Sequence, residues 1–162
     1  MAETLSVTDM LPNKFEPKRT YRWVLAIEGI DAFLVASTNR PTFTIGEKKI
    51  DFINSYRMIA GKLTFGDLSV KLHDPIAPSG AQQVMEWIRT HYESVSGRAG
   101  YADFYKRDIQ LKMLDPIGTV VELWDIKGAF LTNATFNTLD YGNEETMMID
   151  LTIKFDNCVL QF

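Results

Sequence analysis

The architecture of the chain follows from residues 48–74, which read KKIDFINSYRMIAGKLTFGDLSVKLHD. β-Branched and aromatic residues dominate three pieces of this stretch, and residues typical of turns separate them: Asn54-Ser55, Gly61-Lys62 and Gly66-Asp67. We therefore predict strand, turn, strand, turn and strand. The outer part of this series is a long hairpin arm.

The tip of this arm is unusually apolar for a surface turn, where small polar residues are the norm. One interpretation is that the tip folds back over its own barrel. The other is that it docks onto another copy of the chain, because exposed apolar patches mark interaction surfaces. The candidate contact residues between subunits are Phe52, Ile53, Tyr56, Arg57 and Met58.

Length and composition predict one globular domain at residues 21–162, preceded by an N-terminal arm at residues 1–20 that shows no period. The 162 residues are 46% hydrophobic and 23% charged, as in an ordinary folded protein. No apolar run approaches the roughly 20 residues of a membrane span, and the N-terminus lacks a signal-peptide pattern. We expect neither export by a leader nor membrane insertion.

Charge and cysteine content exclude several classes of protein. Cys158 is the only cysteine, so an intramolecular disulfide and a cysteine-rich zinc site are both excluded. The net charge of −4 is opposite in sign to that of proteins that bind nucleic acid through contacts of Lys and Arg with its phosphates. Any nucleic acid that meets this protein is therefore not held by it.

The first half of the chain reads as strands followed by one helix. Residues 21–27 and 32–37 are predicted to pair as a hairpin, and the alternating residues 41–46 lead into the arm. Ser79, followed by Gln82, forms a capping box for a helix whose apolar positions continue to Val95, before Gly97. We expect Val84, Trp87 and Ile88 to pack against the barrel.

The second half returns to strands. Residues 108–114 and 119–126 read as a hairpin around the turn at Asp115-Pro116, and a bulge is expected at Gly128. Residues 146–156 show the cleanest alternation in the chain, with Met147, Ile149, Leu151, Ile153 and Phe155 on one face. The predicted fold is a mainly antiparallel β barrel or sandwich with one flanking helix and a protruding hairpin arm.

The sequence contains no pattern typical of an enzyme. His73 and His91 are the only histidines, and neither has an acidic residue at metal-ligand spacing. Neither a nucleophile elbow nor a phosphate-binding loop is present, and Cys158 has no sequence cue for an activating base. We expect no catalytic activity, no metal and no cofactor.

Two regions resemble the tail tube protein family of contractile-tailed, T-even-like phages. The first is residues 50–75, with Asn54-Ser55-Tyr56-Arg57, Thr64-Phe65-Gly66-Asp67 and His73-Asp74. The second runs from the bend Gly128-Ala129-Phe130-Leu131-Thr132 through Leu139-Asp140-Tyr141-Gly142-Asn143 to Phe155-Asp156. With the helix between them, they cover residues 21–158. Residues 1–20 and Val159 to Phe162 have no counterpart in the family pattern.

The resemblance implies a structural virion protein. It would form hexameric rings that stack into the inner tail tube through which DNA is ejected, with itself, the sheath, baseplate and tape-measure proteins as partners. Assembly would take place in the host cytoplasm. The alternatives are a tube-initiating or tail-terminating paralogue, the tube of a phage-derived injection device that carries effectors, or, in a different class, a monomeric ligand-binding barrel.

If the tube interpretation holds, the polar faces of two alternating strands are candidates for the lumen. An alternation of two places the apolar side chains of each strand in the core and leaves the others on the opposite face. A mixed-charge, net-acidic lining would repel phosphates and let DNA slide. The candidate residues are Ser69, Lys71, His73, Asp150, Thr152, Lys154 and Asp156.

Overall fold

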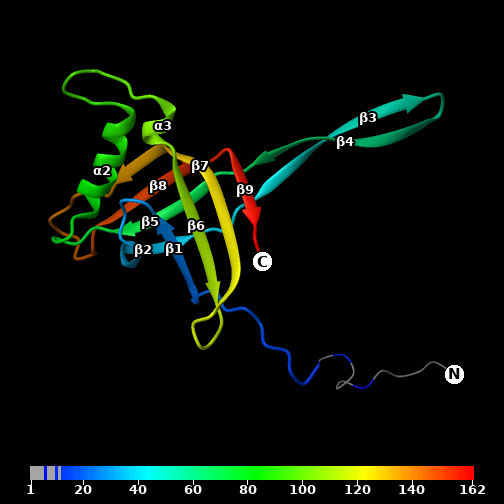
Figure 1. Cartoon of the computed structure of the whole chain (residues 1–162), viewed down its shortest axis with the longest axis horizontal. Helices are drawn as coiled ribbons and strands as arrows, with labels where there is room; N and C mark the ends of the chain where they lie inside the picture. The colour runs from blue at the N-terminus through cyan, green and yellow to red at the C-terminus, as the bar shows by residue number, and fades with distance from the viewer. Residues whose placement is uncertain (1–5, 7–9, 11) are drawn as a thin grey trace.

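The computed structural model describes residues 6, 10 and 12–162. In this part of the chain the elements follow in the order β1 (Trp23–Ile27), η1 (Ala32–Leu34), β2 (Val35–Thr38), β3 (Phe43–Phe52), β4 (Ser55–Phe65), β5 (Leu68–His73), α2 (Gly80–His91), α3 (Ala102–Tyr105), β6 (Arg107–Leu114), β7 (Val120–Phe136), β8 (Met148–Lys154) and β9 (Asn157–Leu160). The predicted class, antiparallel β with a flanking helix and a protruding hairpin, is confirmed (Figure 1). The N-terminal arm predicted at residues 1–20 lies partly outside the described residues.

β7 is long enough to belong to two sheets. Its first part pairs with β6 on one side and with β9 on the other, and its last part, from Phe130 to Phe136, pairs with β8. One sheet therefore has the order β1-β6-β7-β9 and the other β7-β8-β5-β2. All pairs are antiparallel, and β1 and β2 lie at the two ends of the continuous path β1-β6-β7-β8-β5-β2.

The apolar sides of the two sheets form a single core. The alternation of β5 and β8 is as the sequence predicted, and each fully buried aliphatic side chain contributes about 1.5–3 kcal/mol to folding. β1, β6 and β7 supply the opposing layer. The buried side chains of β5 and β8 are Leu68, Val70, Leu72, Ile149, Leu151 and Ile153.

Helix α2 covers one side of this core. Ser79 caps it by accepting a hydrogen bond from the backbone N–H of Gln82 at 3.4 Å, and Val84 and Trp87 are buried, as predicted. The Trp87 indole N–H donates to the carbonyl of Tyr105 at 2.7 Å, which ties α2 to α3. The helix ends at His91, so its predicted continuation to Val95 is wrong because Tyr92 turns the backbone to an extended conformation.

The predicted turn at Gly61-Lys62 is wrong, because β4 passes through these residues without interruption. Gly61 lies across the hairpin from Gly46, where the register of β3 and β4 shifts. A Cβ atom on Gly61 would lie 3.1 Å from the carbonyl carbon of Gly46, so the glycine permits a close approach of the two backbones at a bulge. Gly61 therefore marks a bulge and not the turn that the sequence predicted.

The predicted hairpin between residues 21–27 and 32–37 is also wrong. β1 pairs with β6, β2 pairs with β5, and Ala32–Leu34 forms a 3-10 turn between them. Leu25 of β1 and Leu34, which directly precedes β2, are both buried, but β1 and β2 belong to different sheets. The short distance between the two segments in the sequence favoured a hairpin. Burial of the apolar faces of β1 and β2 instead required partner strands far along the sequence, β6 and β5.

The C-terminal half differs from the prediction in three details. The bulge at Gly128 is confirmed by a φ of +67° and a register shift opposite it, yet β7 continues through it to Phe136. Met147 precedes β8 and is exposed, so its predicted place on the buried face is wrong. Residues Asn157–Leu160, for which no strand was predicted, form β9 against β7.

Candidate assembly surfaces

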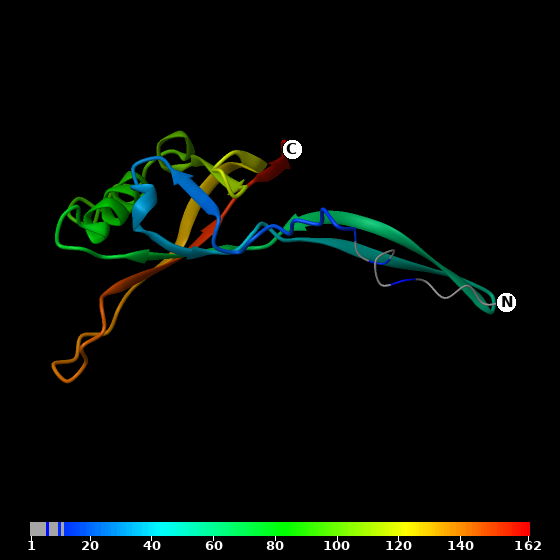
Figure 2. The same cartoon turned by 90° about the horizontal axis from the view of Figure 1, so that it is seen from below.

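The β3–β4 arm projects from the body as a sheet of its own (Figures 1 and 2). Every residue of β3, and every residue of β4 before Phe65, is exposed. Phe52 retains 73% of its accessible surface and Ile53 86%, so the tip does not fold back over its own body. An isolated two-stranded hairpin is marginally stable in water, and among the described residues only Phe65, at the root of this one, packs against the body, where it contacts Phe155.

The strand register divides the candidate contact residues between two faces. One face, which we call the Lys48/Arg57 face, combines the basic side chains of Lys48 and Arg57 with apolar ones. It contains Lys48, Ile50, Phe52, Ser55, Arg57 and Ile59. The other, the Tyr56/Met58 face, contains Glu47, Lys49, Asp51, Tyr56, Met58 and Ala60. On the second face Lys49 pairs with Asp51 at 3.0 Å and lies 4.7 Å from the ring centre of Tyr56.

Ile53 occupies the tip in a conformation that its residue type disfavours. Its φ of +49° lies in the left-handed region, which for a β-branched residue costs roughly 1–2 kcal/mol. Gly or Asn would adopt this conformation more easily. A strained, exposed and apolar residue at a hairpin tip points to a role other than making the turn.

The lumen candidates on β5 and β8 form one exposed polar surface. The two strands are neighbours, with Ser69 opposite Thr152 and Lys71 opposite Asp150. Lys71 and Asp150 form an ion pair at 3.6 Å, and Lys154 lies 3.8 Å from a carboxylate oxygen of Asp67. Positive and negative groups therefore alternate across this face. His73 continues it, opposite Met148.

Asp156 lies apart from this surface. It follows the end of β8, where its backbone N–H donates to the carbonyl of Lys127 and its carboxylate pairs with Lys106 at 2.6 Å. The alternation of residues 146–156 suggested that it continues the face of Asp150. The chain turns towards β9 after Lys154, which takes Asp156 to a different part of the body.

Within the part of the chain that the structure describes, the body leaves several strand edges unpaired. In the β7-β8-β5-β2 sheet these are β2 and the last part of β7, and in the other sheet they are β1 and β9. A hollow of about 660 Å³ lies between β1 and β2 and is lined largely by apolar residues, including Trp23, Phe33 and Val35. Open edges of this kind are templates for pairing with another chain.

Comparison with solved structures identifies this arrangement. A chain of the anti-feeding prophage cap, a tube-terminating cap, has a TM-score of 0.75 and 17% identity over 97% of this chain and 99% of that one. A chain of the PVC sheath/tube terminator, from an extracellular contractile injection system in its extended state, has a TM-score of 0.74 and 14% identity over 92% and 99%. A chain of the PVC sheath-tube complex has a TM-score of 0.68 and 15% identity over 98% and 99%.

The chain has the fold of a tail-tube protein. At these identities the likeness establishes the fold, and function must be argued from the surfaces. No protein-family model and no curated protein matches the sequence. The likeness covers nearly the whole of each chain, so the arm and both sheets belong to the shared tail-tube fold.

In this tail-tube fold a buried carboxylate, which the sequence prediction missed, anchors the two extensions of the chain. Glu122 on β7 accepts hydrogen bonds from Lys18, in the segment before β1, and from the indole N–H of Trp124. Arg40, at the root of the arm, lies 3.6 Å from it. The sequence did offer a signal for this site. Glu122 is a charged residue at an inward position of a strand, and a buried charge requires partners.

The pKa of the Glu122 carboxyl reflects this setting. Burial acts to raise the pKa, but the hydrogen bonds from Lys18 and Trp124 and the charges of Lys18 and Arg40 outweigh it, so the pKa lies below its ordinary value. Glu122 is therefore ionised at neutral pH. Because Lys18 and Arg40 approach the same carboxylate, Glu122 couples the N-terminal segment to the root of the arm.

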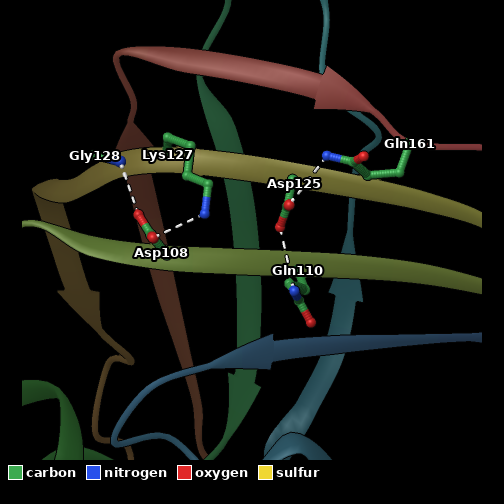
Figure 3. Close-up of polar contacts among 6 residues, drawn as sticks. All are labelled: Asp108, Gln110, Asp125, Lys127, Gly128 and Gln161. Atoms are coloured by element: carbon green, nitrogen blue, oxygen red, sulfur yellow. Dashed lines mark hydrogen bonds and ion pairs between the residues drawn. The ribbon is translucent and has the colours of Figure 1, made fainter.

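The outward face of the β1-β6-β7-β9 sheet carries a polar ladder (Figure 3). Asp108 accepts a hydrogen bond from Lys127 at 3.0 Å, which lowers the pKa of the Asp108 carboxyl and raises that of Lys127. Asp125 accepts from Gln110 at 3.2 Å and from Gln161 at 3.3 Å, so it joins β6, β7 and the C-terminal residues. These contacts satisfy the side chains within the subunit and tie β6, β7 and the C-terminal residues together.

The described residues contain no group of three or more His, Cys, Asp or Glu side chains that could hold a metal ion. His91 packs edge-on against Tyr105 at 4.4 Å between ring centres. Burial, with a smaller effect of Asp125, raises the pKa of Cys158 to about 11, so its thiol is protonated at neutral pH and a poor nucleophile. Within the same residues, no helix is long and apolar enough to cross a membrane.

Proposed function

We propose that this protein is a structural subunit that assembles with copies of itself into the tube of a contractile tail or injection device. The observation that carries the proposal is the β3–β4 arm, which exposes apolar side chains on both faces and forms a sheet of its own apart from the body. Such a hairpin gains stability only when a partner covers it. The tail-tube fold supports another copy of the chain as that partner.

The open strand edges support ring formation. β2 of one subunit and the Phe130–Phe136 part of β7 of the next are the two free edges of the β7-β8-β5-β2 sheet. Pairing them would join the sheets of neighbouring subunits into one continuous barrel and remove edges that otherwise invite aggregation. We propose a closed ring of six subunits, with rings stacked into a hollow tube.

In this arrangement the polar face of β5 and β8 lines the lumen. Its charged groups form two ion pairs, Lys71 with Asp150 and Lys154 with Asp67, so that their charges cancel. Such a surface gives little of the counterion release that makes basic surfaces bind DNA tightly. DNA could then pass without being held, and the same property would suit an effector protein as cargo.

The remaining surfaces suit other components of a tail. We propose that the outward polar ladder faces a sheath, that the ends of the tube meet baseplate and tape-measure proteins, and that the assembled protein resides in a virion or virion-like particle after assembly in the host cytoplasm. A neighbour from a sheath-tube complex supports the first of these partners. The monomeric ligand-binding alternative finds no support, because packed apolar side chains fill the interior.

A second candidate is a component that ends the tube. The likeness to chains from a cap and from a terminator, with TM-scores of 0.75 and 0.74, exceeds the 0.68 found for a chain of the sheath-tube complex. A tube subunit should polymerise into long tubes. A terminator should form rings that do not stack.

The test is the assembly state of the purified protein, measured by light scattering after size exclusion and by negative-stain microscopy. The wild-type chain should form rings or tubes, and Phe52→Ser with Ile53→Ser should leave a folded monomer. Val95→Ser with Ile117→Ser is the matched control, because both side chains are exposed but lie outside the arm. A wild-type protein that remains monomeric at all concentrations would refute the proposal.

A further inference from the structure

The charges of the chain are strongly segregated. Residues 12–22 and 39–65, which form the two extensions, contain nine Lys and Arg but three Asp and Glu. The body, residues 23–38 and 66–162, contains eight Lys and Arg but sixteen Asp and Glu. The net charge of −4 is therefore the sum of +6 on the two extensions, −8 on the body and −2 on residues 1–11.

The Lys48/Arg57 face of the arm is the clearest unsatisfied part of the basic extensions. In the described part of the chain neither Lys48 nor Arg57 has an ion-pair partner, in contrast to Lys49 on the opposite face. The face has no acidic residue, and Ile50, Phe52 and Ile59 lie between its charges. Its occupant should therefore be acidic and should also offer apolar contacts.

The loop between β7 and β8, residues 137–147, has this chemistry. It contains Asp140, Glu144 and Glu145 and no basic residue, and its exposed apolar side chains are Leu139, Tyr141 and Met147. In both views it lies at the end of the molecule remote from the arm (Figures 1 and 2). An arm cannot reach the loop of its own subunit, but it can reach that of another copy.

The loop is also shaped in advance. The carboxylate of Asp140 accepts the backbone N–H of Gly142 at 2.9 Å, and the side chain of Asn143 accepts that of Glu145 at 3.0 Å. These local hydrogen bonds hold the loop in its turn conformation. Glu144 and Glu145 themselves have no cationic partner among the described residues, and a loop held in shape loses less entropy on binding.

Six other carboxylates of the body are already neutralised by a cation of the same subunit. The pairs lie on both sheets and on the helical side of the molecule. They are Lys71 with Asp150, Lys154 with Asp67, Lys106 with Asp156, Lys127 with Asp108, Arg98 with Glu93, and Lys18 and Arg40 with Glu122. Among the described residues, the β7–β8 loop gathers three carboxylates without a cationic partner, Asp140, Glu144 and Glu145, beside exposed apolar side chains.

We propose that the Lys48/Arg57 face of the arm docks on the acidic β7–β8 loop of a second copy of this chain. The inference rests on the proposed function and specifies which two surfaces meet. Because the two surfaces differ and lie at opposite ends of the subunit, the contact is heterologous and propagates from one copy to the next. Lys48 and Arg57 face Glu144 and Glu145, while Phe52 packs on the apolar side chains of the loop.

The test is a reciprocal charge swap, read by the protein concentration needed for assembly in sedimentation. Glu144→Lys with Glu145→Lys, or Lys48→Glu with Arg57→Glu, should raise that concentration by roughly tenfold or more, because like charges would then oppose each other. The chain that carries all four changes should recover to within about threefold of wild type, because opposite charges meet again. Glu86→Lys with Asp103→Lys is the control for net charge and should assemble as wild type.

Circular dichroism of each variant, together with the milder Glu144→Gln and Glu145→Gln pair, separates loss of folding from loss of docking. The neutral pair should assemble less well than wild type and should be less sensitive to added salt, because screening then has fewer charges to act on. The pairing of the arm with the loop is refuted, while the proposed function stands, by either of two results. One is a loop variant that assembles as wild type, and the other is a fourfold variant that needs a higher protein concentration for assembly than either double variant. A wild-type chain that does not assemble overturns the proposed function and the pairing with it.

Discussion

Substitution of Ile53 by Asn separates the stability of the arm from its role in assembly. Ile53 is 86% exposed at the arm tip and has a φ of +49°. If the residue only makes the turn, Asn is the better choice, because it adopts the left-handed conformation with less strain. If Ile53 docks on another subunit, Asn removes an apolar contact that no other residue replaces.

The two effects have opposite signs. Relief of the left-handed strain of a β-branched residue should stabilise the isolated subunit by about 1 kcal/mol. Loss of an isoleucine that becomes buried on docking should weaken each contact by about 1.5–3 kcal/mol, since that is the free energy of burying such a side chain. A difference of 1.4 kcal/mol is roughly tenfold in affinity, so assembly should require about ten to a hundred times more protein.

Two measurements on the same preparation decide the matter. Urea unfolding of the subunit below its assembly concentration should give equal or higher stability for Ile53→Asn, and sedimentation should show the loss of assembly. Ile117→Asn serves as the control, because this exposed isoleucine lies in the turn between β6 and β7. Unchanged assembly of Ile53→Asn would refute the assignment of the tip as a docking contact.

Three further changes test the rest of the structure. Trp87→Ala should lower the free energy of unfolding by about 3–5 kcal/mol, because the ring is buried and its N–H is hydrogen-bonded; a loss below about 1 kcal/mol on chemical denaturation would place the helix face elsewhere. Glu122→Gln should cost on the order of 1–2 kcal/mol at neutral pH. The depressed pKa means that the wild-type contribution is present above the ordinary pKa of 4.5 and is lost as the pH falls through the folded value, so wild type and Glu122→Gln should converge in acid-unfolding curves, and a constant gap would contradict this. Asp150→Lys should leave folding and tube formation intact and slow the transit of nucleic acid through the tube, because a basic lumen attracts phosphates; equal transit rates would remove the electrostatic part of the lumen proposal.

Asp156 is a poorer site than Asp150 for a test of the lumen prediction. The sequence placed it with Asp150, but it pairs with Lys106 near the start of β6. A charge reversal there would break a short contact at 2.6 Å with the less exposed Lys106, whereas reversal of Asp150 breaks only the longer pair with Lys71 at 3.6 Å, between two exposed side chains. Asp150 is the better target, because its strand position on the exposed face of β8 was predicted correctly.

Local chemistry in the sequence determined much of the fold. The alternation in Leu68–His73 and Met148–Lys154 set which side chains are buried, because a strand turns successive residues to opposite sides. Ser79 and the apolar spacing of Val84 and Trp87 set the start and the buried face of α2. The apolar tip of the arm was equally visible, because turns on a wet surface rarely carry Phe and Ile together.

Only the tertiary structure decided which strands pair and which surfaces remain free. β1 and β2 are neighbours in sequence but lie at opposite ends of the sheet path, because a strand edge accepts any partner and the choice depends on burying the faces of all strands at once. For the same reason no local pattern revealed that Lys18 and Arg40 would meet at Glu122. The charges of the basic arm and of the acidic β7–β8 loop are evident from the sequence. Their location at opposite ends of the molecule depends on the fold (Figure 1).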